Sequence, residues 1–141
     1  MNTIDTSPYG ALLLRLALGV MYIAHGLLKI FVFTLPGTVS FFENFGYPGW
    51  MAYAVVVAEI GGGVLLIAGL YVRPVALALA PVLMGALISV HWANGWLFSS
   101  KGGGWEYPAF LVAASVALAL TGGGAYTISL PFSGKGSGET S

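Results

Sequence analysis

Four apolar segments, each long enough to cross a bilayer as a helix, constrain the fold of this chain more than any other feature. They cover residues 9–33, 50–72, 74–98 and 105–121. A transmembrane helix needs about 20 mainly apolar residues, because the hydrocarbon core is about 30 Å thick. Only 7% of the residues are charged, too few to cover a soluble domain, in which about 25% is usual. We therefore predict an all-α integral membrane protein, a four-helix bundle.

The boundaries of the segments indicate one membrane domain, over residues 1–130. The Gly- and Ser-rich residues 131–141 predict a flexible tail. The first apolar segment lacks a preceding basic region and is longer than the core of a secretory signal, so we expect it to be retained. Residues 36–49 are rich in Gly, Pro and aromatic side chains, which favours a loop or short helix at the membrane interface. Pro81 predicts a kink.

The distribution of basic residues gives a weak prediction of orientation. Four spans place both termini on one side, and Arg15, Arg73 and Lys135 lie toward that side. Lys29 and Lys101 lie toward the other. Since cytoplasmic segments carry an excess of Lys and Arg, we expect an inner-membrane protein with both termini in the cytoplasm.

Charge and cysteine content exclude several classes of function. Five basic and five acidic residues give a formal net charge of zero, without the basic surface that nucleic acids require. Cysteine is absent, which excludes thiolate nucleophiles and cysteine-ligated iron-sulfur clusters. Any redox chemistry must therefore use a cofactor or a partner protein.

Polar side chains are concentrated in the half of the bundle farthest from the termini. His25 and His91 each lie roughly 10 to 12 Å below the ends of their spans, at nearly equal depth. The other polar residues of this half are Lys29, Glu59, Asn94 and Glu106. A charge in hydrocarbon costs several kcal/mol unless it meets a partner or a water-filled cavity. We therefore predict a polar pocket, with aromatic walls formed by Trp92, Trp96, Trp105 and Tyr107.

Structural roles are the alternative for each of these residues. Glu59 can serve as the partner of Arg15 in a structural ion pair, or of Lys29. Lys29 can instead extend to the lipid headgroups, and the histidines can bridge helices by hydrogen bonds. Equal histidine depth would also suit a haem, but the sequence carries no specific haem or metal signature, so we expect neither. Residues 61–63, three consecutive glycines, would let another helix or a flat ligand approach the backbone closely, and close helix packing is the favoured role.

Motifs distributed over all four segments resemble one known family. They are Leu14-Arg15-Leu16-Ala17-Leu18-Gly19, His25-Gly26, Lys29, Glu59-Ile60-Gly61-Gly62-Gly63, Leu70-Tyr71-Val72-Arg73, His91, Asn94-Gly95, Gly103-Gly104-Trp105-Glu106-Tyr107-Pro108 and Leu120-Thr121-Gly122. In order and spacing they resemble the DoxX family. The resemblance implies a four-helix membrane protein, often a membrane partner of soluble redox or sulfur-handling proteins.

The resemblance and the polar residues together favour a quinone-linked redox subunit. In this hypothesis His25 or His91 donates a hydrogen bond to a quinone carbonyl, and Lys29 stabilises the developing anion. Glu59 or Glu106 would supply or remove protons. Two alternatives remain: a non-enzymatic anchor for a soluble redox partner, and a small transporter or proton path. Homo-oligomerisation is compatible with each.

Overall fold

Helices account for all regular structure in the part of the chain that the computed structural model describes, residues 3–128 and 130. The elements are α1 (Ser7–Phe31), α2 (Leu35–Asn44), α3 (Trp50–Ala68), α4 (Val72–Ala86), the π-helix η1 (Leu87–His91), the short 3₁₀ helix η2 (Trp92–Asn94) and α5 (Glu106–Thr121). This confirms the predicted all-α class. The predicted tail, residues 131–141, lies outside the described residues.

Three helical stretches of the described residues are long and apolar enough to span a membrane. They are Ser7–Phe31, Trp50–Ala68 and Val72–Asn94, the last running through α4, η1 and η2. α5 is equally apolar in character but has only 16 residues, which corresponds to about 24 Å of helix, less than the roughly 30 Å of hydrocarbon. The chain is an integral membrane protein in which α5, the fourth apolar segment, is shorter than each of the three long spans.

The observed ends of two spans differ from the predicted ones for backbone reasons. The second span was predicted to reach residue 72, but α3 ends at Ala68 because Gly69 adopts a left-handed conformation (φ 78°) that stops the helix. The third was predicted to continue to residue 98, but regular helix ends at Asn94. Gly95, with φ 80°, then starts the connection to α5.

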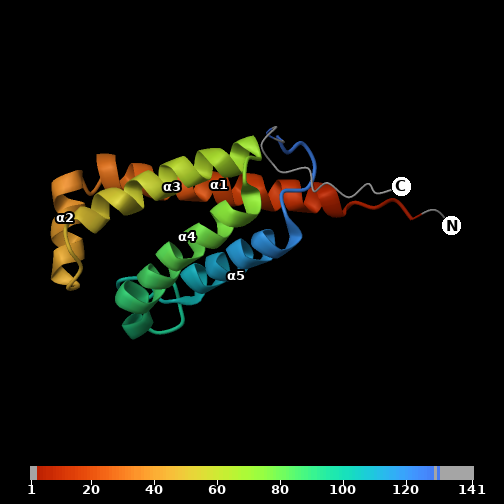
Figure 1. Ribbon diagram of the computed structural model, residues 1–141. Coiled ribbons are helices and arrows are strands. Elements are labelled where there is room, and N and C mark those ends of the chain that lie inside the picture. The colour runs from red at the N-terminus through yellow and green to blue at the C-terminus, as the bar shows by residue number, and fades with distance from the viewer. Residues whose placement is uncertain (1–2, 129, 131–141) are drawn as a thin grey trace, which may run out of the picture.

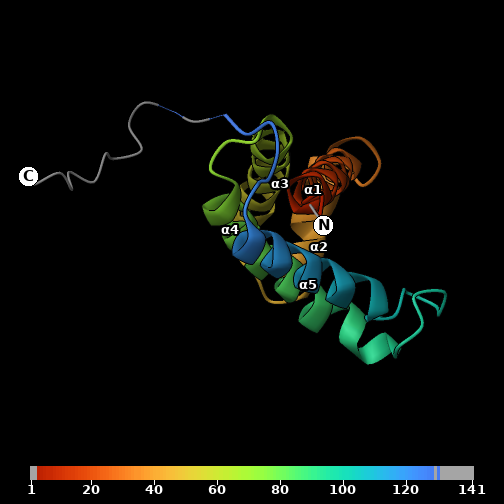
Figure 2. The ribbon, with the colours of Figure 1, turned by 90° about the vertical axis from the view of Figure 1, so that its right-hand side faces the viewer.

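The bundle consists of two antiparallel helix pairs. α1 packs mainly on α3 and α4 mainly on α5 (Figure 1). The view along the bundle in Figure 2 shows the two pairs side by side. α2 lies across the end of α1 and α3 that is opposite the N-terminus (Figure 1), which agrees with the short interfacial helix expected there.

Glycines bring α1 and α3 into backbone contact. A Cβ atom on Gly63 would lie 2.7 Å from the carbonyl oxygen of Gly19, and one on Gly19 would lie 2.9 Å from that of Gly63. Gly62 faces Leu79 of α4, where a Cβ would lie 2.7 Å from a side-chain methyl group, whereas Gly61 has open space around it. Close helix packing, one predicted role of residues 61–63, is therefore what Gly62 and Gly63 provide.

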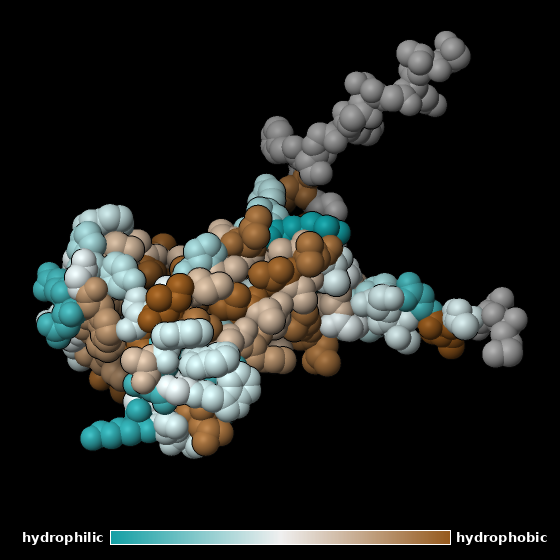
Figure 3. Space-filling view, turned by 90° about the horizontal axis from the view of Figure 1, so that it is seen from below, coloured by the Kyte–Doolittle hydropathy of each residue, from teal (hydrophilic) through white to brown (hydrophobic). Residues whose placement is uncertain are grey.

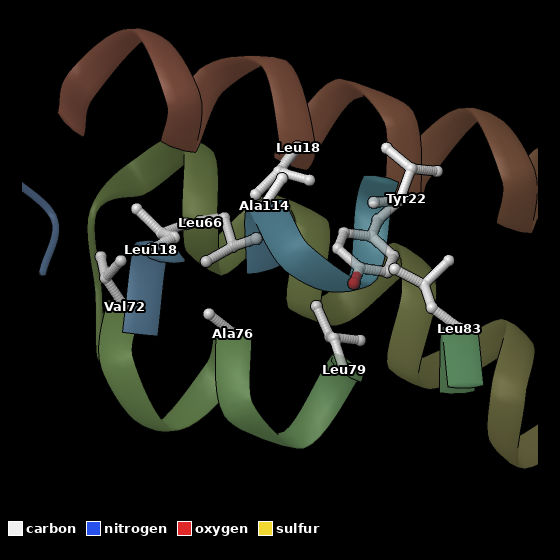
Figure 4. Packing of buried hydrophobic residues seen from close by; sticks show 10 residues of the cluster. Leu18, Tyr22, Leu66, Val72, Ala76, Leu79, Leu83, Ala114 and Leu118 are labelled. Atoms are coloured by element: carbon white, nitrogen blue, oxygen red, sulfur yellow. The ribbon is translucent and has the colours of Figure 1, made fainter. Parts of the chain in front are cut away.

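A hydrophobic core fills the half of the bundle nearer to the termini. Figure 4 shows Leu18 and Tyr22 of α1 facing Ala76 and Leu79 of α4 across this core. The Tyr22 hydroxyl is fully buried and forms a 2.8 Å hydrogen bond with the Ser115 hydroxyl of α5. An unpaired hydroxyl away from water is costly. This hydrogen bond gives each of the two buried hydroxyls a partner.

The outer surface of the bundle is apolar, as expected where a protein faces lipid. In Figure 3 brown, hydrophobic residues cover the middle of the visible face, and most of the hydrophilic ones lie toward its ends. Large side chains such as Leu13, Val57, Leu77, Phe110 and Leu120 are more than 60% exposed. In water such a surface would aggregate, whereas in a bilayer it is the favourable one.

Arg15 fastens the C-terminal segment to the bundle and does not pair with Glu59. Only 1% of the Arg15 side chain is exposed. Its guanidinium donates to five backbone carbonyls, at 2.8 to 3.4 Å, those of Leu66, Ile67, Gly123, Ala125 and Tyr126. The predicted Arg15–Glu59 ion pair is therefore wrong. Arg15 donates instead to carbonyls at the end of α3, which have no partner within the helix, and to carbonyls of residues 123–126.

Replacing Gly63 by alanine should weaken the α1–α3 contact. The new Cβ would overlap the backbone of Gly19, and overpacking of this kind costs about 1–3 kcal/mol. Gly61→Ala is the matched control, because open space surrounds Gly61 and alanine favours a helix by about 0.5–1 kcal/mol over glycine. Thermal unfolding in detergent should show a lower Tm for the first variant only; equal Tm values would contradict the backbone contact.

Replacing Arg15 by lysine should destabilise the protein although it keeps the charge. A lysine ammonium has three donors at a single point and cannot reach all five carbonyls of the two separate segments. We expect a loss of about 2–3 kcal/mol in unfolding free energy, since bonds to charged groups contribute about 1.5–3 kcal/mol each. Arg73→Lys is the control, because Arg73 is exposed and, among the residues that the structure describes, bonds to the carbonyls of Leu120 and Thr121 alone. A similar loss in both variants would argue against this role.

Candidate functional site

A buried ion pair joins α1 and α3 in the half of the bundle that contains the polar residues. Lys29 Nζ lies 2.9 Å and 2.8 Å from the two carboxylate oxygens of Glu59. The side chains are 19% and 5% exposed. The Lys29 ammonium therefore points into the bundle rather than toward headgroups, and Glu59 has Lys29 as its partner.

α2 is connected to the same turn of α1. The Thr38 hydroxyl is buried, and it lies 3.0 Å from the carbonyl oxygen of Lys29 and 2.8 Å from that of Thr34. Thr38 thus fixes the end of α1 that carries the ion pair. Sequence reasoning missed this residue, since a threonine in an interfacial segment carries no distinctive signal.

His25 lies one turn before Lys29, and its hydrogen bonding defines which ring nitrogen bears the proton. Its Nδ1 atom lies 2.9 Å from the carbonyl oxygen of Met21. A carbonyl oxygen can only accept, so Nδ1 carries the hydrogen and Nε2 of the neutral ring is an acceptor. Within residues 3–128, Nε2 has no hydrogen-bond partner. The ring stacks with Tyr107, with centroids 6.3 Å apart and planes at 26°.

His91 ends the π-helix and is bonded in the same way. Its Nδ1 atom lies 2.9 Å from the carbonyl oxygen of Gly103, so this ring too presents Nε2 as an acceptor when neutral. The Asn94 amide donates at 3.0 Å to the carbonyls of Val90, Gly102 and Gly103. Asn94 therefore holds the loop before α5 in place. The π-helix that ends at His91 is a feature frequent at functional sites.

The connection from η2 to α5 is a compact loop closed by its own backbone. Trp105 donates from its N–H to Gly95, and Gly104 to Leu97, both at 2.9 Å. Glu106 accepts a 3.1 Å hydrogen bond from the N–H of Phe98 through Oε1. The Glu106 carboxylate thus stabilises the loop and is held at the start of α5.

Aromatic rings connect the two histidines. The Tyr107 ring lies 5.0 Å from that of Phe98, and Phe98 lies 6.3 Å from His91. Together with the His25–Tyr107 stack, this gives a continuous row of four rings, which we call the ring row: His25, Tyr107, Phe98 and His91. Phe98 was not predicted as a site residue, although it is the last residue of the predicted segment 74–98 that carries His91.

The predicted tryptophans form a separate cluster beside the ring row. Trp105 stacks on Trp92 at 5.3 Å and meets Trp96 edge-on at 4.6 Å. Trp92 and Trp96 are each more than half exposed. Tryptophans with this exposure are typical of the membrane interface, whereas their role in the wall of a pocket stays a prediction.

The predicted polar residues therefore fall into two groups. Lys29, Glu59 and His25 lie on α1 and α3, whereas His91, Asn94 and Glu106 lie on η1, η2 and α5. The ring row joins the groups, and no ion pair or hydrogen bond links them among the described residues. Within the same residues, no three His, Asp or Glu side chains gather as a metal site would require.

One further contact and one hollow were missed by sequence reasoning. The Tyr47 hydroxyl is hydrogen-bonded to the Ser89 hydroxyl, which ties the α2–α3 connection to the π-helix. A hollow of about 360 Å³ lies at the opposite end of the bundle, lined by Asp5, Ser7, Pro8, Gly10, Ala11, Leu14, Thr121 and Gly124. Hydrogen bonds from Ser7 lower the pKa of the Asp5 carboxyl, which is fully exposed. That hollow holds none of the predicted site residues.

Comparison with known proteins agrees with the arrangement of the helices. The DoxX family model matches residues 10–92. A Bacillus subtilis (strain 168) protein named "Putative oxidoreductase CatD" is 36% identical over 133 residues, which cover 94% of each chain. The Escherichia coli (strain K12) "Inner membrane protein YqjF" is 32% identical over 127 residues, 84% of this chain and 88% of that one. No solved structure matches.

The match includes three of the four membrane helices and the residues that connect them. The first of the two relatives aligns along nearly its whole length, so the correspondence extends beyond the family model into α5. Arg15, His25, Lys29, Glu59 and His91 all fall within residues 10–92. On this basis the chain belongs to the DoxX family of membrane proteins.

Proposed function

We propose that this protein is the membrane subunit of a redox system and binds a quinone, or a similar flat molecule, along the ring row. One observation carries this proposal: two histidines whose Nε2 atoms have no hydrogen-bond partner among the described residues stand at the ends of a row of aromatic rings. Flat ligands bind between aromatic side chains, and a few polar groups fix their orientation. The relative named as an oxidoreductase supports the redox part of the proposal.

Access from the bilayer suits a lipid-soluble ligand. Tyr107 is 36% and Phe98 45% exposed, and both lie next to helices whose outer faces are apolar. A quinone dissolved in the membrane would reach these rings without crossing water. Its isoprenoid tail would remain in the lipid, where no specific contact is needed.

The chain itself can handle protons but needs a partner for electrons. Reduction of a quinone to a quinol consumes two electrons and two protons. The histidines and the carboxylates of Glu59 and Glu106 are groups that exchange protons, whereas no cysteine is present to ligate an iron-sulfur cluster. The electrons would come from a soluble redox protein docked on the membrane domain.

The Lys29–Glu59 pair would support the site electrostatically. Two opposite charges at 2.8 Å form a dipole inside the membrane, one turn from His25. Fixed charges in a medium of low dielectric act strongly on neighbouring charge. The pair would therefore act on charge that develops on a ligand bound beside His25.

Quinone binding can be tested through the tryptophans beside the ring row. A short-chain benzoquinone should quench the fluorescence of the purified protein in a saturable way. Replacing Tyr107 by alanine should lower the affinity roughly 3- to 10-fold, because aromatic pairs contribute about 0.5–1.5 kcal/mol. Tyr9→Ala is the matched control, since Tyr9 is exposed at the far end of α1. Quenching that does not saturate, or equal affinities in both variants, would favour the anchor or transporter alternatives.

The orientation in a bacterial inner membrane is a second, independent part of the proposal. Since the chain has no cysteine, single-cysteine variants can be labelled without background. A membrane-impermeant maleimide added to intact spheroplasts should label Lys101→Cys, in the loop before α5, and leave Thr6→Cys unlabelled until the cells are lysed. The reverse pattern would place both ends of the described chain outside the cytoplasm.

A further inference from the structure

Tyr107 is the member of the ring row whose hydrogen-bond donor has no partner among the residues that the structure describes. The neutral rings of His25 and His91 each have a single N–H, and both use it at Nδ1 to bond a backbone carbonyl at 2.9 Å. Phe98 has no polar side-chain atom. The Tyr107 hydroxyl can donate one hydrogen bond, and no described residue accepts it. A ligand lying along the row can therefore use this donor.

The Tyr107 ring is held in place on both sides. Its centroid lies 6.3 Å from that of His25 and 5.0 Å from that of Phe98. The backbone just before it is held as well, because the N–H of Glu106 donates to the carbonyl of Trp96 at 3.1 Å. The ring thus needs little reordering when a ligand arrives, and this lowers the entropic cost of binding.

The stack on His25 places the Tyr107 ring below the end of the membrane span. His25 precedes Phe31, where α1 ends, by about 9 Å along the helix. The Tyr107 ring lies close to that depth, because the two stacked rings are neighbours. A hydroxyl surrounded by lipid tails is costly when unpaired, since hydrocarbon offers no acceptor.

Two tyrosines elsewhere in the bundle have partners for their hydroxyls within the protein. The Tyr22 hydroxyl is bonded to that of Ser115 at 2.8 Å, and the Tyr47 hydroxyl is bonded to that of Ser89. Tyr107 differs from both, because its side chain is 36% exposed and its hydroxyl has no partner in the described part of the chain. This hydroxyl is therefore available to a molecule that arrives from the bilayer.

We propose that the Tyr107 hydroxyl donates a hydrogen bond to a carbonyl oxygen of the bound ligand and so selects a ring that carries a carbonyl. This inference rests on the proposed function and adds the group that recognises the ligand. It also changes the donor expected from the sequence, because each neutral histidine uses its N–H for a backbone carbonyl. A site that offers a donor favours a ligand with an acceptor, since an analogue without one leaves the hydroxyl unpaired.

Infrared difference spectroscopy of an isotope-labelled, short-chain benzoquinone reports this hydrogen bond directly. A hydrogen bond lowers the stretching frequency of a carbonyl, so the bound quinone should show a band below that of the same quinone in detergent micelles. Tyr107→Phe keeps the ring and removes the hydroxyl, so the band should return toward the micelle value. Tyr9→Phe is the matched control and should leave the band unchanged, because Tyr9 is exposed at the far end of α1.

Binding affinity gives a second measurement. Tyr107→Phe should weaken quinone binding roughly 2- to 10-fold, the effect of losing one neutral hydrogen bond. An alkylbenzene with the same ring substituents but no carbonyl group should bind the wild-type protein and Tyr107→Phe equally, as measured by its competition with the quinone for fluorescence quenching. Equal alkylbenzene affinities would also show that the variant keeps the fold and the shape of the site.

The outcomes separate this inference from the proposed function. A carbonyl band that is unshifted in the wild-type protein, or a band and affinity that are the same in Tyr107→Phe, would overturn the inference and leave the quinone-binding proposal standing. An equal loss of affinity for both ligands would also overturn it, because the variant would then have disturbed only the packing of the rings. Absence of saturable quinone binding by the wild-type protein would remove the proposed function and the inference together.

Discussion

The buried ion pair between Lys29 and Glu59 depends on how closely α1 and α3 approach, and much of the remaining structure follows from that approach. A charge cannot be left without a partner in a medium where desolvation costs several kcal/mol. The glycines of α1 make room for the partner: a Cβ on Gly26 would lie 3.4 Å from Cβ of Glu59 and 2.5 Å from the Ile60 side chain. Gly19 lies two turns before Gly26 on α1, and it packs on Gly63, which lies one turn after Glu59 on α3. The two helices therefore meet along their backbones.

Different interactions hold the helices together within the α1–α3 pair and between the two pairs. α1 and α3 are held by glycine contacts and by the ion pair, whereas α4 and α5 meet α1 through the apolar core and the Tyr22–Ser115 hydrogen bond. Lipid tails are as apolar as leucine, so burial alone gives little driving force within a membrane. Close contact and satisfied polar groups therefore have to supply specificity. Arg15 does this at the end nearest to the termini, where it collects carbonyls of two distant segments.

How far the sequence predicted this structure depended on the kind of information required. Hydropathy located the four membrane segments, because length and apolar character alone decide that question. The Arg15–Glu59 pairing failed because depth along a helix says nothing of residues 123–126, which fold back over Arg15. Equal depth of His25 and His91 was compatible with several arrangements, and only the loop carbonyl of Gly103 and the rings between them define the observed one. Whether these residues bind a quinone remains a prediction.

The π-helix at Leu87–His91 makes the direction of His91 depend on chain length. A π-turn, with its i→i+5 hydrogen bond, contains one residue more than an α-turn. Removing a single residue from this segment would restore the regular α-helical winding and rotate everything beyond it by about 100°, the advance of one residue. His91 would then leave Gly103 and Phe98, and the Tyr47–Ser89 contact would be lost as well. The position of the His91 ring therefore depends on the number of residues in this segment as well as on their side chains.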